Sequence, residues 1–157
     1  MKKIKWKTLL ISVAIPLLVG GLSALLTMGS MDIFDLVEKP PLSPPAWLFT
    51  VVWTLLYTLM GVSCYRLIEA RADQESKTHA LVLYALQLVF NFLWSIFFFN
   101  LEAYGFSFVW LVAMLALIVL TTVRFWKIDN VAGILLTPYI VWVAYAGYLN
   151  AGIAILN

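Results

Sequence analysis

The chain has 157 residues, of which 64% are hydrophobic and 11% are charged, and its formal net charge is +2. This composition, with a mean hydropathy of +0.97, excludes an ordinary soluble domain and indicates an integral membrane protein. The small positive charge requires no nucleic-acid partner, because basic residues that flank membrane segments account for it.

Charged residues divide the chain into five uncharged stretches, at 8–31, 40–65, 80–101, 103–123 and 130–157. A hydrocarbon core about 30 Å thick needs roughly 20 helical residues, and lipid cannot satisfy free backbone groups. The sequence therefore predicts an all-α membrane protein, a single bundle of five transmembrane helices at about 8–28, 45–66, 79–100, 103–124 and 130–155. Because most connections are short, we expect one domain over 1–157.

The first predicted helix follows four lysines and resembles a signal peptide, but residues 24–31 form a poor cleavage pattern, so we keep it as a helix. It carries Pro16 and a run of small residues, Gly20, Gly21, Ser23 and Ala24. Such a run permits close helix packing or leaves room for a ligand, and packing is the favoured interpretation.

The connection at 29–45 is acidic first and rich in proline afterwards, with prolines at 40, 41, 44 and 45. Prolines fix φ and disfavour helix in the residues before them, so we expect a stiff, extended lid over the entrance of the second helix. Ser43 is the predicted N-cap of that helix.

Aromatic and neutral polar side chains recur at helical spacing on three of the predicted helices. They are Phe49, Trp53, Tyr57 and Met60 on the second; Tyr84, Gln87, Asn91, Trp94 and Phe98 on the third; and Trp142, Tyr145, Ala146 and Leu149 on the fifth. At a rise of about 1.5 Å per residue, Trp53, Asn91, Trp142 and Ala146 lie roughly 12–20 Å below the same end of the bundle.

Any one of these residues alone is more simply explained by packing, by an interfacial aromatic belt or, for Asn91, by a hydrogen bond between helices. Their common depth favours one aromatic cavity instead. Trp6 and Trp47 lie near helix ends and are assigned to the belts.

The predicted spans carry no charge, which argues against an ion-coupled pump. No metalloprotease, phosphate-loop or catalytic-triad motif is present. His79 is the single histidine and suits an interfacial position better than a haem ligand. Cys64 is the single cysteine, which excludes an intramolecular disulfide and a cysteine cluster. We therefore expect neither a metal nor a cofactor.

Nine of the ten Lys and Arg residues precede the first predicted helix or lie in the connections after the second and fourth, and only Lys39 lies at the other end. The positive-inside rule then predicts a cytoplasmic N-terminus and an external C-terminus in a cell membrane.

Three segments carry a family resemblance: KPPLSPPAWLFTVVWTLLYTLMG at 39–61, NFLWSIFFF at 91–99 and PYIVWVAYAGYLN at 138–150. In this order and spacing they resemble the TspO/MBR family, also called translocator protein, peripheral-type benzodiazepine receptor or tryptophan-rich sensory protein, and a bacterial member in particular. The resemblance implies a five-helix bundle, commonly a homodimer, that binds porphyrins, in some members sterols, and synthetic isoquinoline-carboxamide or benzodiazepine-type ligands.

The resemblance also implies a pocket lined by Trp53, Asn91, Trp94, Trp142 and Ala146, with Phe106 where animal members tend to have Trp. Pro45 of the lid and the face residues Phe49, Tyr57 and Leu149 complete the predicted ligand-binding set. Sterol-binding members carry Tyr and then Arg after the Leu–Asn pair of the last helix. This chain has Ala151 and Gly152 there, which makes a sterol doubtful as the natural ligand.

The leading functional hypothesis is a membrane receptor or sensor for porphyrin-type tetrapyrroles, with an outward-facing aromatic pocket under the proline-rich lid. A second is enzyme-like degradation of porphyrin by light and oxygen, with Trp53 and Trp142 as redox-active neighbours, although no catalytic motif supports it. A third is transport of a porphyrin or sterol, or regulation of a partner protein, although no repeat suited to alternating access is visible.

Overall fold

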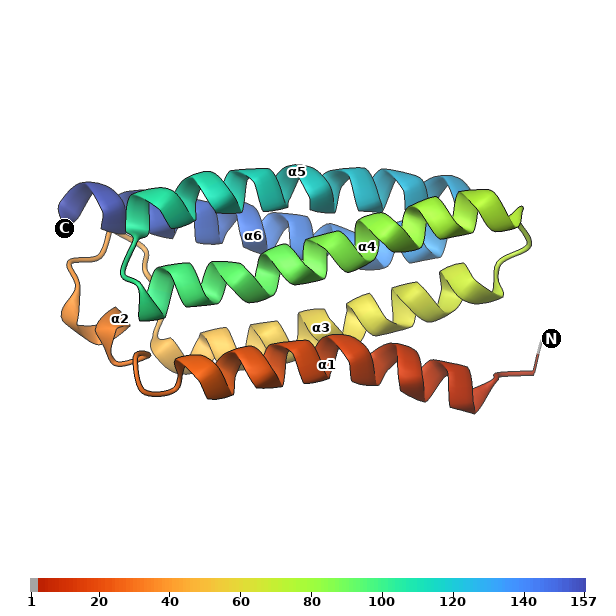
Figure 1. Ribbon diagram of the computed structural model, residues 1–157, viewed down its shortest axis with the longest axis horizontal. Helices are drawn as coiled ribbons and strands as arrows, with labels where there is room; N and C mark the ends of the chain where they lie inside the picture. Colours follow the sequence, from red (N-terminus) through yellow and green to blue (C-terminus); the bar gives the residue numbers. More distant parts are fainter. Residues whose placement is uncertain (1–2) are drawn as a thin grey trace.

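The computed structural model describes residues 3–157 as a bundle of long helices (Figure 1). The elements are α1 (Trp6–Thr27), a short α2 (Ile33–Leu36), α3 (Ala46–Glu69), α4 (Gln74–Ser95), a π-helical segment η1 (Ile96–Asn100), α5 (Tyr104–Ile128) and α6 (Asn130–Leu156). Within these residues five helices are long and apolar enough to cross a membrane, with η1 continuing α4 as one span. The predicted fold class and the five spans are confirmed.

The chain passes back and forth along the bundle, so its described termini lie at opposite ends (Figure 1). We call the end that holds residues 3–7, 66–79 and 124–129 the basic end, and the end that holds residues 28–45, 100–104 and 157 the acidic end. The helix pairs with the most extensive contact are α5 with α6, α1 with α3, and α4 with α5. The acidic end also carries α2.

Three helices extend by three or more residues beyond the boundaries predicted from charge, and one of them is α5, which ends at Ile128 instead of 124. α3 runs to Glu69 and α4 begins at Gln74, five residues before the predicted start. Asp73 caps α4 by accepting a hydrogen bond from the Ser76 N–H at 2.7 Å. Charge marks where lipid ends, whereas a capped helix continues into water.

The outward faces of the bundle are apolar. Leu18, Leu25, Val109 and Val141 each expose between 66% and 70% of their surface. The buried interior holds several polar side chains, among them Gln87, Asn91 and Asn150. This inversion of the usual soluble pattern suits helices whose partners outside the bundle are lipid chains, and the protein is an integral membrane protein.

A polar clamp closes the basic end. Arg66 on α3 donates two hydrogen bonds to Asp129, from Nε to Oδ1 at 3.1 Å and from Nη2 to Oδ2 at 2.9 Å. Asp129 also accepts from the Ala132 N–H at 2.8 Å and so caps α6. The Ser63 hydroxyl donates to the Ala132 carbonyl at 2.7 Å. These contacts fix α3 against the α5–α6 turn.

The predicted cap of the second membrane helix is wrong. α3 has Pro45 at its N-cap position without a side-chain hydrogen bond, and the Ser43 hydroxyl donates instead to the Pro40 carbonyl at 2.7 Å. The backbone reverses at Leu42, whose φ of 67° lies in the left-handed region. This turn directs Ser43 back toward the proline segment and away from the first turn of α3.

Candidate ligand-binding cavity

A cavity of about 440 Å³ lies in the acidic half of the bundle. We call it the acidic-end cavity. α1, α3, the α4–η1 span and α6 form its walls, and residues 31–35 contribute from the connection. Predicted site residues that line it are Phe49, Trp53, Tyr57, Trp94, Ala146 and Leu149.

The cavity walls are built from paired aromatic rings. Trp53 and Tyr57 on α3 stack with centroids 5.4 Å apart. Trp94 stacks on Phe98 at 5.3 Å, and the π-helical turn brings Phe99 to the same wall. Flat aromatic walls with few polar groups suit a planar apolar ligand.

The small residues of α1 form a wall that the three-helix prediction did not include. Gly20, Gly21, Ser23 and Ala24 all line the cavity. A Cβ on Gly20 would approach the Tyr57 ring to 2.3 Å, whereas one on Gly21 would have no atom within 4 Å. Both alternatives therefore apply: Gly20 permits close packing and Gly21 leaves open space. The run of small residues at 20–24 was the feature of the sequence that indicated this wall.

Behind the aromatic wall, a buried hydrogen-bond chain joins α3, α4 and α6. The Tyr57 hydroxyl donates to Asn91 Oδ1 at 2.7 Å, and Asn91 Nδ2 donates to the Tyr139 hydroxyl at 2.8 Å. Tyr139 donates in turn to Gln87 Oε1 at 2.8 Å. Asn91 does not line the cavity, and its contact with a ligand would pass through Tyr57. Asn91 therefore forms hydrogen bonds between helices, which was the simpler of the two explanations offered for it from the sequence.

Asn150 is a cavity residue absent from the predicted set. Its Oδ1 accepts from Trp94 Nε1 at 3.0 Å and from the Ser107 hydroxyl at 3.1 Å, and its Nδ2 donates to the Tyr104 carbonyl at 2.8 Å. Asn150 thus fixes the Trp94 indole and joins α4, α5 and α6. A buried amide in a membrane helix was the signal in the sequence.

The lid divides into two parts. Met31, Asp32, Phe34 and Asp35 line the cavity, and the Phe34 ring meets Phe49 edge to face at 5.1 Å. Lys39 holds this part in place, because its ammonium donates to the Phe34 carbonyl at 2.6 Å and lies 4.8 Å from the ring centroid.

The proline-rich part of the lid docks on α6 and does not line the cavity. The Tyr148 hydroxyl donates to the Pro41 carbonyl at 2.8 Å, and the Tyr145 hydroxyl donates to the Leu42 carbonyl. Pro40 packs against Gly152, where a Cβ would lie 2.5 Å from Pro40 Cγ. Pro45 is exposed and lies outside the cavity lining.

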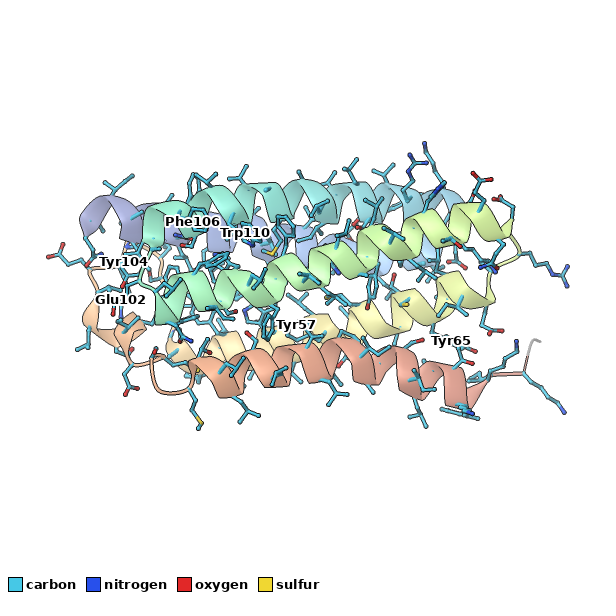
Figure 2. The ribbon with its side chains drawn as sticks, in the orientation of Figure 1. Tyr57, Tyr65, Glu102, Tyr104, Phe106 and Trp110 are labelled. Atoms are coloured by element: carbon cyan, nitrogen blue, oxygen red, sulfur yellow. The ribbon has the colours of Figure 1, made fainter. Side chains whose placement is uncertain are left out.

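Two predicted aromatic residues also lie outside the lining. Phe106 is 54% exposed and packs on Phe97 at 5.0 Å, and in the view of Figure 2 it lies with Trp110 on the opposite side of the α4 ribbon from Tyr57. Trp142 is half-buried behind Phe49, with ring centroids 5.6 Å apart, and its buried indole N–H has no hydrogen-bond partner within residues 3–157.

Within residues 3–157, no group of three or more His, Cys, Asp or Glu side chains could hold a metal ion. His79 lies exposed in the first turns of α4 at the basic end, and Cys64 is a buried free thiol on α3.

Comparison with known proteins gives one consistent result. The TspO/MBR family profile matches residues 12–156. Protein CrtK of Rhodobacter capsulatus is 34% identical over 138 residues, which are 88% of this chain and 85% of CrtK. The tryptophan-rich protein TspO of Archaeoglobus fulgidus is 40% identical over 121 residues, 77% of each chain. The translocator protein of Bos taurus is 33% identical over 138 residues, 87% of this chain and 82% of its own.

Proposed function

The chain belongs to the TspO/MBR family of membrane sensors and translocators, and on that basis we propose that it is a receptor that binds porphyrin-type tetrapyrroles in the acidic-end cavity. Synthetic isoquinoline-carboxamide and benzodiazepine-type ligands would bind at the same place. The observation that carries the proposal is the cavity itself, about 440 Å³ in volume and walled by the Trp53–Tyr57 and Trp94–Phe98 stacks.

The polar groups near the cavity suggest how a ligand would be oriented. Asp32 and Asp35 line the entrance, and the Tyr57 hydroxyl is already bonded to Asn91. The Trp142 indole N–H is buried without a partner behind Phe49. A small movement of Phe49 would let this donor reach a ligand carbonyl or carboxylate, which would remove the cost of an unsatisfied buried donor.

Gly21→Leu tests the cavity directly. A side chain at Gly21 projects into open space, so Leu fills volume there without a clash. We expect protoporphyrin to bind the variant at least tenfold more weakly when tryptophan quenching is followed in detergent. Gly105→Leu is the matched control, because a Cβ there also meets nothing within 4 Å and Gly105 lies outside the lining. Equal affinity of Gly21→Leu and wild type would refute the site.

The same titration examines individual tryptophans. Trp53 lines the cavity, whereas Trp6 is 63% exposed at the basic end. Trp53→Phe should weaken binding and reduce the quenching, while Trp6→Phe should leave the affinity unchanged.

Light- and oxygen-dependent degradation of the porphyrin is a second candidate, favoured by the contact of Trp53 with the cavity and by its stacking on Tyr57. Here the porphyrin would sensitise oxygen and an indole would supply electrons. Illumination of the complex should then yield a product with a new absorption band that Trp53→Phe or Trp142→Phe abolishes and Trp6→Phe retains. The same bleaching in detergent alone would exclude this activity.

We also propose that the protein forms a homodimer, with its N-terminus cytoplasmic and its C-terminus external. Transport of a porphyrin or sterol is the third candidate function. Light scattering of the detergent-solubilised protein gives its oligomeric state. Flux of labelled porphyrin into liposomes separates the hypotheses, because a receptor binds without protein-dependent flux.

A further inference from the structure

A second cavity, of about 230 Å³, lies in the basic half of the bundle between α1, α3 and α4. We call it the basic-end cavity. α1 contributes Lys7, Thr8, Ile11, Ser12 and Ile15, α3 contributes Cys64 and Ile68, and α4 contributes Tyr84. It shares no lining residue with the acidic-end cavity, so it is a separate site.

One buried hydroxyl on this cavity has no hydrogen-bond partner within residues 3–157. Tyr84 is 5% exposed, and its hydroxyl forms no hydrogen bond within residues 3–157. Ser12, which is 4% exposed, places a second hydroxyl in the lining of the same cavity. Buried donors normally find an acceptor, and leaving one unsatisfied is costly. The site therefore lacks an acceptor that a ligand could supply.

The mouth of the cavity carries a positive charge and its sides are apolar. Lys7 lies at the mouth and forms no ion pair within residues 3–157. Ile11 and Ile15 are 51% and 49% exposed on the outward face of α1, so the cavity continues onto the lipid-facing surface. About 7 Å of helix separates Lys7 from Ser12 at a rise of about 1.5 Å per residue.

We propose that the basic-end cavity binds one anionic glycerophospholipid from the adjacent membrane leaflet. The phosphate group lies at Lys7, an ester carbonyl accepts hydrogen bonds from Tyr84 and Ser12, and an acyl chain leaves along Ile11 and Ile15. A phospholipid places its negative charge, its ester oxygens and its chains in this order along its length. Anionic lipids also gather where basic residues meet the membrane. A lipid bound in this cavity would contact α1, α3 and α4 together and so hold α1 against the other two helices.

The reactivity of the native Cys64 thiol reports whether the basic-end cavity is occupied, so no cysteine has to be introduced. Cys64 is the single cysteine of the chain and lines the cavity, so a bound lipid should slow its reaction with the small uncharged reagent methyl methanethiosulfonate, followed by intact mass. The protein is placed in phosphatidylcholine nanodiscs in which phosphatidylglycerol replaces a rising fraction of the lipid. We expect phosphatidylglycerol to protect Cys64 in a saturable way.

Two chemical comparisons separate the parts of the site. Phosphatidylglycerol with ether-linked chains has the same charge but no ester carbonyl, so it should need roughly fivefold more lipid for half protection. Tyr84→Phe or Ser12→Ala should shrink this difference between ester and ether lipids. Lys7→Gln should raise the lipid needed for half protection by about fivefold, whereas Lys127→Gln, a basic residue at the same end outside the cavity, should not.

The thermal unfolding temperature in detergent, measured with the same lipids and variants, gives a second readout that does not depend on Cys64 reactivity. A higher unfolding temperature with phosphatidylglycerol than with phosphatidylcholine, reduced in Lys7→Gln, supports the site. Equal Cys64 protection and equal unfolding temperature in the two lipids overturn it. Protection by oleate but not by phosphatidylglycerol would also overturn it, because the occupant would then be a free fatty acid.

Discussion

Asp129 holds two connections at once, because its carboxylate caps α6 and pairs with Arg66 of α3. Burial alone would raise the pKa of this carboxyl. The hydrogen bonds from Arg66 and from the Ala132 N–H, together with the Arg66 charge, outweigh burial and hold the pKa below its usual value. The ionised form therefore stabilises the fold above pH ~3.9, and that contribution is lost as the pH falls through the lowered pKa.

Asp129→Asn should therefore lower the unfolding temperature at pH 7. A loss of about 1 kcal/mol corresponds to a shift of roughly 2–4 °C in a chain of this size. The difference from wild type should shrink below about pH 4 and vanish once the wild-type carboxyl is protonated. Glu75→Gln, on the exposed first turn of α4, is the control and should show no such trend. A difference that persists undiminished below the lowered pKa would contradict the mechanism.

At the scale of elements, the connection at 28–45 works as a two-part lid whose proline-rich half is fixed to α6. Gly152 is central to this docking, because only a residue without a Cβ lets Pro40 approach so closely. The hydroxyls of Tyr145 and Tyr148 donate hydrogen bonds to the Leu42 and Pro41 carbonyls of the same proline-rich half. The other half, around Phe34, lines the acidic-end cavity and is held by Lys39 and by contact with Phe49.

Gly152→Ala should detach the proline-rich half. The added Cβ would lie 2.5 Å from Pro40 Cγ, so the loop must shift away from α6. We expect faster hydrogen exchange of the backbone N–H groups at 35–39 and faster ligand release from the acidic-end cavity. Gly105→Ala serves as the control, because a Cβ there meets nothing within 4 Å. Unchanged exchange at 35–39 in Gly152→Ala would show that Pro40 docking does not hold the lid.

At the scale of the whole molecule, charge is distributed unequally between the two ends. Within residues 3–157, eight of the nine Lys and Arg residues lie at the basic end, while Asp32, Asp35, Glu38 and Glu102 lie at the other. The acidic-end cavity lies in the half with little positive charge. If the basic end is cytoplasmic, that cavity is in the outer half of the membrane.

Cysteine labelling in intact cells tests this orientation. In a Cys64→Ser background, Leu101→Cys places a thiol at the acidic end and Ala72→Cys places one at the basic end, both at exposed positions. A membrane-impermeant maleimide should label the first variant in intact cells and the second only after permeabilisation. The reverse pattern would invert the proposed orientation and place the acidic-end cavity toward the cytoplasm.

The sequence by itself determined the class of protein, the number of spans and the inward face of the third span. These follow from local rules: a span must be long and uncharged to cross lipid, and side chains three or four residues apart share a helix face. Tyr84, Gln87, Asn91, Trp94 and Phe98 are all buried, as their spacing predicted.

Only the tertiary structure decided which of the inward residues reach the cavity. Trp53 and Ala146 line it, whereas Trp142 lies behind Phe49 and Asn91 behind Tyr57. Depth along a helix follows from a fixed rise per residue, but the rotation of each helix and the order of its neighbours depend on packing between segments far apart in the chain. For the same reason, the place of α1 in the wall and the docking of the prolines on α6 emerge only when the five helices are assembled.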